Sequence, residues 1–308
     1  MIKKLALVFI ALSLAVSAPA QTIDDGIMVA KRSLFTGGLY GHDTWDHYWE
    51  GALKRENANV GTVTTETNVW YADYGITDRV NVIAMVPYIW TEASQGVLHG
   101  IQGLQDLTVA AKWNFLEQPS TKIGTFRTFA VLSAGFPLTD YNIELLPLSI
   151  GTGSSRFSGR FTANVQTGPG WYVNGSTAYT WRSSTTLDRP YFFTDDEFVM
   201  STQVDMPNVF DYVVNVGYLK NGLNTNFAFS QQQTLGGGDI RRQDMPFASN
   251  RMNFTKMGGM VMYPVPKIQA LAFQFSYAYT ATGRNVGQAN SYSTGLLYTF
   301  NSRRSSRP

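Results

Sequence analysis

Six charged residues in this sequence stand where they could line a water-filled passage. Each lies in a segment in which polar and apolar residues alternate, on the polar side of that alternation. Because successive side chains of a strand point to opposite faces, the six would project together from the wet face of a sheet. Charged side chains placed around a pore in this way set its selectivity. The lumen-lining candidates are Asp106, Lys112, Arg127, Arg156, Arg160 and Arg182.

Five of these six residues are basic, and the sequence leaves two arrangements open for them. They form a free basic stripe, or they pair with carboxylates of a long loop, such as Asp188 or Glu197, and brace or plug the pore. The same loop, residues 183–208, is the longest expected connection, and long loops of this kind are usually functional. We predict that it folds inward as a constriction. Its constriction candidates are Tyr191, Phe192, Phe193, Asp195 and Asp196.

Catalytic and metal chemistry have little support in the sequence. His42 and His47 stand close to several carboxylates, but their odd separation puts them on opposite faces of a strand, so they could not share a metal ion. The third histidine, His99, lies in an expected external loop without a nucleophile and base arranged around it. We therefore predict a non-enzymatic protein with no catalytic residues, no metal site and no cofactor.

The first twenty residues predict a cleaved export signal. Lys3 and Lys4 precede an apolar stretch that is too short to span a membrane, and Ala18-Pro19-Ala20 is a typical cleavage pattern. Removing the two lysines takes the basic residues from 24 to 22, equal to the 22 acidic ones, so the mature chain has no net charge. A nucleic-acid partner thereby loses its main support.

Composition separates the mature chain from ordinary exported domains. It has no cysteine, so no disulfide framework stabilises it. Aromatic residues make up 14% and charged residues only 15% of the sequence, against about 25% charged residues in a typical soluble domain. After the signal, no apolar stretch reaches the roughly 20 residues of a membrane helix. These values suit a sheet with one face in lipid and the other in water.

Period-two alternation in segments of about ten residues is the strongest pattern, and it is typical of transmembrane β-barrels. Short and long connections alternate between the segments, and Asn221-Gly222 is a strong hairpin turn. Because bacterial barrels have an even number of strands, a twelfth strand is expected within residues 33–54. The other eleven are expected at residues 62–73, 80–90, 104–116, 125–136, 155–167, 170–182, 208–220, 223–233, 251–263, 268–280 and 291–300.

The placement of aromatic residues favours lipid over the alternative, a soluble exported β-sandwich. On the apolar face of residues 171–181, Trp171 and Trp181 stand at the two ends with smaller residues between them. Ten residues at roughly 3.3 Å each, tilted by about 40°, span about 25 Å, which is the height of the apolar band of such barrels. In residues 80–90, Val82 and Tyr88 should face lipid. Ile83 and Met85 should face inward, where their apolar character is unexpected for a wet lumen.

Three segments carry a resemblance to a known family. They are Tyr-Gly-Ile-Thr-Asp-Arg at 74–79 with Pro87-Tyr88, then Gly-Leu-Gln-Asp-Leu at 103–107 followed by Lys112-Trp113, and Ser133 to Thr139. Together they resemble the outer-membrane family described as putative MetA-pathway of phenol degradation. The resemblance implies an outer-membrane barrel and passage of small or aromatic molecules, and it supplies no catalytic residues.

We therefore expect an all-β, transmembrane antiparallel barrel of about 12 strands in the bacterial outer membrane. Its organisation is a signal peptide at 1–20, one barrel domain at 21–300 and a short basic tail at 301–308. The expected function is diffusion of small solutes, including hydrophobic or aromatic ones. The alternative is a non-conducting barrel that serves as an adhesin or scaffold. The expected partners are outer-membrane lipid, the solute and the barrel assembly machinery, with the chain itself a monomer.

Overall fold

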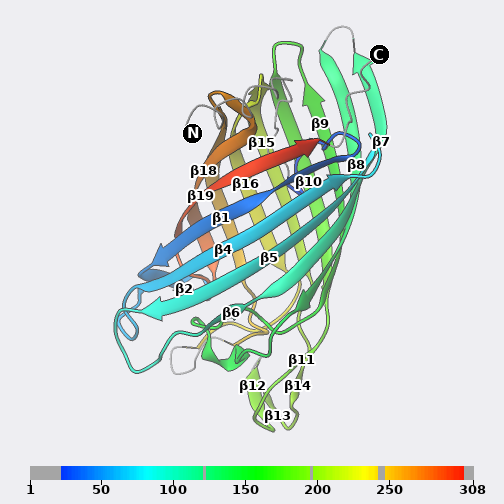
Figure 1. Ribbon diagram of the computed structural model, residues 1–308. Coiled ribbons are helices and arrows are strands. Elements are labelled where there is room, and N and C mark those ends of the chain that lie inside the picture. Colours follow the sequence, from blue (N-terminus) through cyan, green and yellow to red (C-terminus); the bar gives the residue numbers. More distant parts are fainter. Residues whose placement is uncertain (1–21, 121–122, 195–196, 242–246, 302–308) are drawn as a thin grey trace, which may run out of the picture.

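The computed structural model describes residues 22–120, 123–194, 197–241 and 247–301, and its long strands form one closed antiparallel barrel (Figure 1). Each strand pairs with the next one along the chain, and β1 closes the ring by pairing with β19. The short β6 (Gln102–Leu104) pairs only with β5. The twelve strands of the wall are β1 (Ser33–Trp45), β4 (Val63–Gly75), β5 (Val80–Ala93), β7 (Asp106–Ser120), β8 (Gly124–Pro137), β9 (Arg156–Gln166), β10 (Trp171–Arg182), β15 (Val209–Lys220), β16 (Leu223–Thr234), β17 (Asn253–Val265), β18 (Ile268–Arg284) and β19 (Asn290–Asn301).

The predicted all-β barrel of about 12 strands is confirmed, and the strand expected within residues 33–54 is β1. The two ends of the barrel differ, as Figure 1 shows, with tight turns at one end and long connections at the other. At the turn end, Asn221 and Gly222 both have positive φ, 53° and 82°, as a two-residue hairpin turn requires. By the usual orientation of such barrels, the short turns face the periplasm and the long loops face the outside.

The long connections at the outer end carry the small elements of the structure. The small elements are β2 (His47–Glu50), β3 (Leu53–Glu56), η1 (Ile143–Leu145), β11 (Thr185–Thr186), β12 (Phe192–Thr194), β13 (Glu197–Val199) and β14 (Gln203–Val204). Within residues 183–208, β11 pairs with β14 and β12 pairs with β13.

The side chains of β5 point alternately into the barrel and out toward lipid, as the sequence predicts. Asn81 and Ile83 point inward and are buried, whereas Val82 and Tyr88 point outward and are 40% and 38% exposed. Those exposed apolar side chains would be unfavourable in water, and in a bilayer they meet hydrocarbon instead. The inward and outward faces of the strand follow directly from the period of two.

Aromatic side chains form two belts on the outer surface. At the outer end, Trp181 contacts Phe157, which contacts Phe136, with ring centroids 5.7 and 5.8 Å apart. At the periplasmic end, Trp171 and Tyr218 pack edge to face at 5.3 Å. Tryptophan and tyrosine favour the membrane–water interface because their rings are amphipathic. The belts mark the two edges of the apolar band, and no helix among the described residues is long and apolar enough to cross a membrane.

The apolar band predicts the effect of a charge placed on it. Val214 lies on the outer face of β15, beside Gly175 and between the two belts. Val214→Arg should lower the free energy of unfolding by about 2–4 kcal/mol, because an arginine near the bilayer midplane is poorly solvated. Urea unfolding in phospholipid vesicles, followed by tryptophan fluorescence, measures the change.

Leu53→Arg is the matched control, since Leu53 is exposed in β3 outside the band. It should change the free energy of unfolding by no more than about 0.5 kcal/mol. Equal effects of the two substitutions would contradict the position of the band.

Candidate functional site

The interior of the barrel contains an apolar layer near its periplasmic end. Strands from most of the wall contribute one inward side chain each, and all of these are buried. Met85, Leu39 and Met260 pack against the layer from the same interior. The inward apolar residues of β5 therefore belong to a packed core. The layer consists of Phe35, Tyr71, Ile83, Ala110, Val131, Met262, Ala272 and Leu297.

Residues 22–30, which we call the plug segment, fill the barrel at this level. Val29 is a buried member of the apolar layer, and Ile23 packs against it. Gly26 lies so close to the wall that an added Cβ would stand 2.5 Å from Cβ of Asn164. Only glycine fits there without displacing the strand. The plug segment thus packs directly against the wall in the periplasmic half of the lumen.

A buried ion pair fixes the plug segment to the wall. Lys112 has no exposed side-chain surface, and its Nζ donates to Oδ1 of Asp25 at 2.6 Å and to the carbonyl of Thr22 at 2.9 Å. The same ammonium lies 5.4 Å from the ring centre of Phe129. Asn174 Nδ2 donates to the carbonyl of Asp24 at 2.8 Å. Burial raises the pKa of Asp25, and the neighbouring Lys112 acts in the opposite direction.

The turn between β4 and β5 holds the chain where the plug segment joins β1. Arg32 has a φ of 59°, which reverses the chain, and its N–H donates to the carbonyl of Gly75 at 2.7 Å. A Cβ on Gly75 would lie 2.2 Å from the carbonyl oxygen of Ala30. Oδ1 of Asp78 accepts from the N–H of Lys31 at 3.4 Å. The segment Tyr-Gly-Ile-Thr-Asp-Arg at 74–79 thus directs residues 22–30 into the lumen.

Four of the five basic candidates form ion pairs in the structure, but with other carboxylates than those of the long loop that the pairing hypothesis named. Arg156 binds Asp106 at 2.9 Å and Arg160 binds Asp211 at 2.7 Å. Both carboxylates come from wall strands one strand removed from β9, namely β7 and β15, and not from the loop of residues 183–208 as the pairing hypothesis assumed. Arg127 also binds a carboxylate of the wall near the periplasmic turn, that of Glu117 at 3.2 Å.

Arg182 differs from the other four basic candidates. Within the described part of the chain it has no carboxylate partner, and its Nε is buried without a hydrogen-bond acceptor. Its backbone N–H donates to Asn208 Oδ1 at 3.0 Å, which fixes the end of β10 but leaves the side chain unbound.

Three outer loops meet in an apolar core of their own, which we call the loop core. Phe192 stacks on Phe247 with ring centroids 5.3 Å apart, and Arg189 binds Glu144 across two loops at 2.7 Å. In the third of these loops, the Asp239 carboxylate accepts hydrogen bonds from the side chains of Arg284 and Asn285, and these bonds lower the pKa of the Asp239 carboxyl. The loops are residues 138–155, 183–208 and 235–252, and their buried core residues are Ile143, Leu187, Phe192, Val204, Met206, Phe247 and Ala248.

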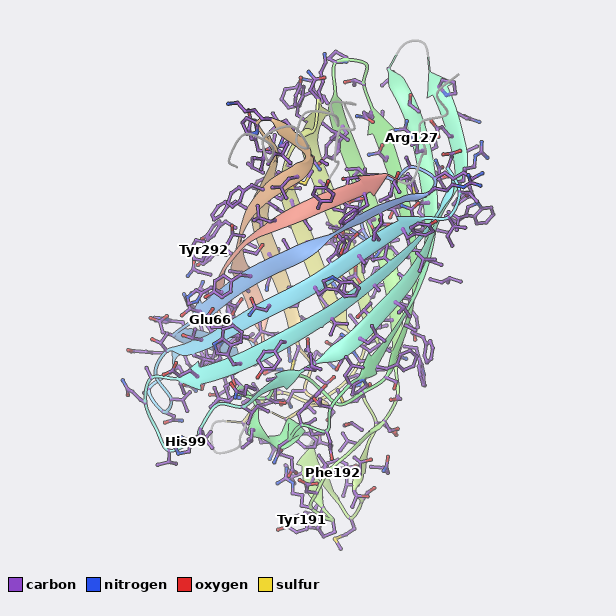
Figure 2. All side chains as sticks on the ribbon, viewed as in Figure 1. Glu66, His99, Arg127, Tyr191, Phe192 and Tyr292 are labelled. Carbon is purple, nitrogen blue, oxygen red and sulfur yellow. The ribbon has the colours of Figure 1, made fainter. Side chains whose placement is uncertain are left out.

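The predicted constriction loop is thus only partly packed. Phe192 is buried in the loop core, whereas Tyr191 and Phe193 are 47% and 43% exposed. Figure 2 places Tyr191, which directly precedes β12, beyond the strands of the wall. Asp195 and Asp196 lie outside the described residues. Contact with the other loops includes β12, where Phe192 stacks on Phe247 and Thr194 hydrogen-bonds to Ser249, and the narrowing of the lumen by this loop stays a prediction.

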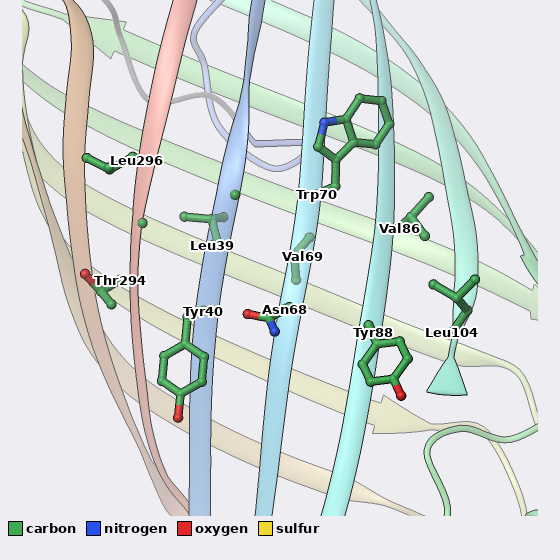
Figure 3. A pocket seen from close by; sticks show the side chains of 12 residues that line it. Leu39, Tyr40, Asn68, Val69, Trp70, Val86, Tyr88, Leu104, Thr294 and Leu296 are labelled. Carbon is green, nitrogen blue, oxygen red and sulfur yellow. The ribbon is translucent and has the colours of Figure 1, made fainter. Parts of the chain in front are cut away.

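Two further features lie on the outer face, away from the lumen. A groove of about 710 Å³, shown in Figure 3, is bordered by Tyr40, Trp70, Tyr88 and Leu104, and it faces lipid. Beside it, His42 Nδ1 lies 2.8 Å from Oε1 of Glu66, whose other oxygen accepts from the Tyr40 hydroxyl. Among the described residues, no cluster of three or more histidines and carboxylates could hold a metal ion.

Sequence reasoning missed the plug segment, although two signals pointed to it. The inward face of residues 80–90 was too apolar for a wet lumen, which implies a packing partner. Lys112 stands inward in a segment whose inward neighbours, Ala110 and Asn114, are uncharged, which implies a carboxylate from elsewhere. The plug segment supplies the apolar packing partner through Ile23 and Val29, and it supplies the carboxylate through Asp25.

Comparison with known proteins agrees with this architecture. Residues 56–294 match the model of the family described as putative MetA-pathway of phenol degradation. No curated protein matches the chain.

Among solved structures, an outer-membrane channel from Pseudomonas putida F1 is similar with a TM-score of 0.68 at 14% identity, covering 88% of this chain and 97% of the other. The NanC porin is similar with a TM-score of 0.46 at 8% identity, covering 84% and 98%. At these identities the similarity concerns the fold. The closed barrel with its apolar outer band is an outer-membrane barrel.

The buried ion pair predicts how the plug segment can be released. In Asp25→Ala, Lys112 remains buried without a counter-charge, which should destabilise the docked segment by about 3–5 kcal/mol. Single-channel conductance in planar bilayers should therefore rise.

Asp24→Ala is the control, because among the described residues the Asp24 side chain hydrogen-bonds only to the hydroxyl of Thr22. It should leave conductance unchanged. Adding Lys112→Met to Asp25→Ala removes the unpaired charge and should close the barrel again. An Asp25→Ala variant with the conductance of the unaltered protein would contradict the assigned role of the pair.

Proposed function

The chain belongs to the family described as putative MetA-pathway of phenol degradation, and from this premise we propose that it is an outer-membrane channel for small solutes with an apolar, often aromatic, body. In this proposal the plug segment and the loop core are its two closures, on the periplasmic and outer sides respectively.

The observation that carries the proposal is the chemistry of the inner layer. If the plug segment left its place, the inward side chains around it would form an apolar wall with Phe35, Ile83 and Leu297 among its members. An apolar solute would be favoured there by roughly 25 cal/mol for each Å² of apolar surface that it buries. A hydrophilic solute would instead lose hydrogen bonds to water along this wall. The layer thus supports selection of apolar over hydrophilic solutes.

The lumen is also two-sided, which supports a solute with one polar group. The apolar layer lies mainly on β17, β18, β19, β1, β4 and β5. The opposite strands β9, β10 and β15 contribute buried polar residues, among them Thr162, Asn174 and Asn215. A molecule with an apolar ring and a polar substituent matches both sides.

A second candidate function is supported by the filled interior. A barrel that is packed by its own plug segment and covered by a loop core could act as a non-conducting surface scaffold or adhesin. The exposed aromatic side chains of the β12–β13 hairpin and the residue before it, Phe193, Phe198 and Tyr191, favour this alternative, since exposed apolar clusters often mark interaction surfaces. The two candidates differ in whether the interior ever opens.

Solute uptake separates the two functions. We expect a deletion strain to take up radiolabelled toluene several times more slowly than the same strain carrying the gene, because the outer leaflet is a poor path for apolar solutes. Uptake of arabinose, which is small and hydrophilic, should not change. A barrel lacking residues 22–30 should conduct more ions than the full chain in planar bilayers.

Equal toluene uptake in the two strains, together with no conductance from the shortened barrel, would reject the channel and leave the scaffold.

A further inference from the structure

The outer part of the lumen contains two arginines at one cross-strand position. Arg156 on β9 is directly opposite Arg182 on β10 in the strand register. Both stand on the inward side of the alternation, since their neighbours Phe157 and Trp181 are exposed to lipid. Side chains directly opposite each other on one face are about 4.5–5.5 Å apart at Cβ, and like charges at this position destabilise a sheet. A repulsive pair in the wall requires a compensating anion.

The carboxylates of the wall neutralise only part of the positive charge of this arginine pair. Asp106 binds Arg156 at 2.9 Å, and Asp106 also accepts a hydrogen bond from the hydroxyl of Tyr141 at 2.8 Å. The next carboxylate, Asp211, is occupied by Arg160. Arg182 keeps a full positive charge and a buried Nε that has no acceptor among the described residues. An unsatisfied buried donor of this kind is costly, and a bound anion would remove the cost.

The surroundings favour an anion that carries an aromatic or apolar body. Tyr141 connects the arginine pair to the loop core, because it binds Asp106 through its hydroxyl and packs against the buried residues of the core through its ring. Gly135 lies under the Arg156 guanidinium, and an added Cβ there would stand 3.1 Å from Nε. The Arg156 side chain is still 37% exposed, so this part of the lumen is open to solvent.

We propose that Arg182, with Arg156 beside it, binds the carboxylate of an aromatic acid whose ring packs against Tyr141 and the loop core. A planar guanidinium offers two parallel N–H donors that match the two oxygens of a carboxylate. Arg156 stays bound to Asp106 and attracts the carboxylate of the solute by its positive charge, while Arg182 makes the direct contact with that carboxylate. The inference rests on the proposed function, because it names the class of solute that the channel receives at its outer end.

Binding to the full-length mature protein in detergent tests the site without requiring transport. Isothermal titration with benzoate should give an affinity at least about tenfold higher than with benzamide, which keeps the ring and loses the charge. Acetate, which keeps the charge and loses the ring, should also bind more weakly than benzoate. In Arg182→Gln the benzoate affinity should fall to that of benzamide, and Arg182→Lys should keep part of it.

Arg127→Gln is the matched control, because it removes the same charge from an inward arginine near the periplasmic turn. It should leave benzoate binding unchanged, and the shift in gel mobility on heating confirms that each variant is a folded barrel. Equal affinities for benzoate and benzamide, equal losses in Arg182→Gln and Arg127→Gln, or inorganic phosphate binding as tightly as benzoate would each overturn the proposal. Benzoate binding that persists in a protein without conductance or toluene uptake would reject the channel and retain the site.

Discussion

Every backbone N–H and C=O in the bilayer must find its partner within the protein, and the rest of this structure follows from that constraint. The pairing of β1 with β19, from Ser33 with Asn301 to Thr44 with Asn290, removes the last free edges of the sheet. Once the ring is closed, each strand has one face in lipid and one face inside. The closed ring also fixes an interior that side chains of twelve strands do not fill by themselves. Residues that precede β1 occupy part of this interior.

The inner closure combines two forces that depend on each other. The Lys112 ammonium is tolerable without solvent only because Asp25 and the Thr22 carbonyl replace water around it. The same desolvation depends on the packing of Ile23 and Val29 against the apolar layer, which excludes water from the pair. A change to either part therefore weakens the other.

Local alternation in the sequence was enough to predict eleven strands and their two faces, and the even strand number of bacterial barrels added the closing strand. The faces of β5 and the aromatic ends of β10 follow from the period of two alone. The ion pairs could not be predicted in this way, because Arg160 on β9 and Asp211 on β15 are separated by β10 and meet only through the register and tilt of the assembled wall. The plug segment was missed for a related reason. Residues 22–30 have neither strand nor helix periodicity, and their position depends on the Arg32 turn and on Gly75, which are tertiary features.

The plug segment has the same two-sided chemistry as the lumen that holds it. Ile23 and Val29 contact the apolar layer, while the Asp25 carboxylate contacts the buried ammonium of Lys112 on β7. A chain segment that fits the lumen thus combines apolar groups with a carboxylate held by a cation. At the outer end, Arg182 and Tyr141 offer a cation and an aromatic surface in the same combination. A solute that satisfies the outer position therefore has the chemistry that the inner position accepts, and the two positions select for one class of molecule along one path.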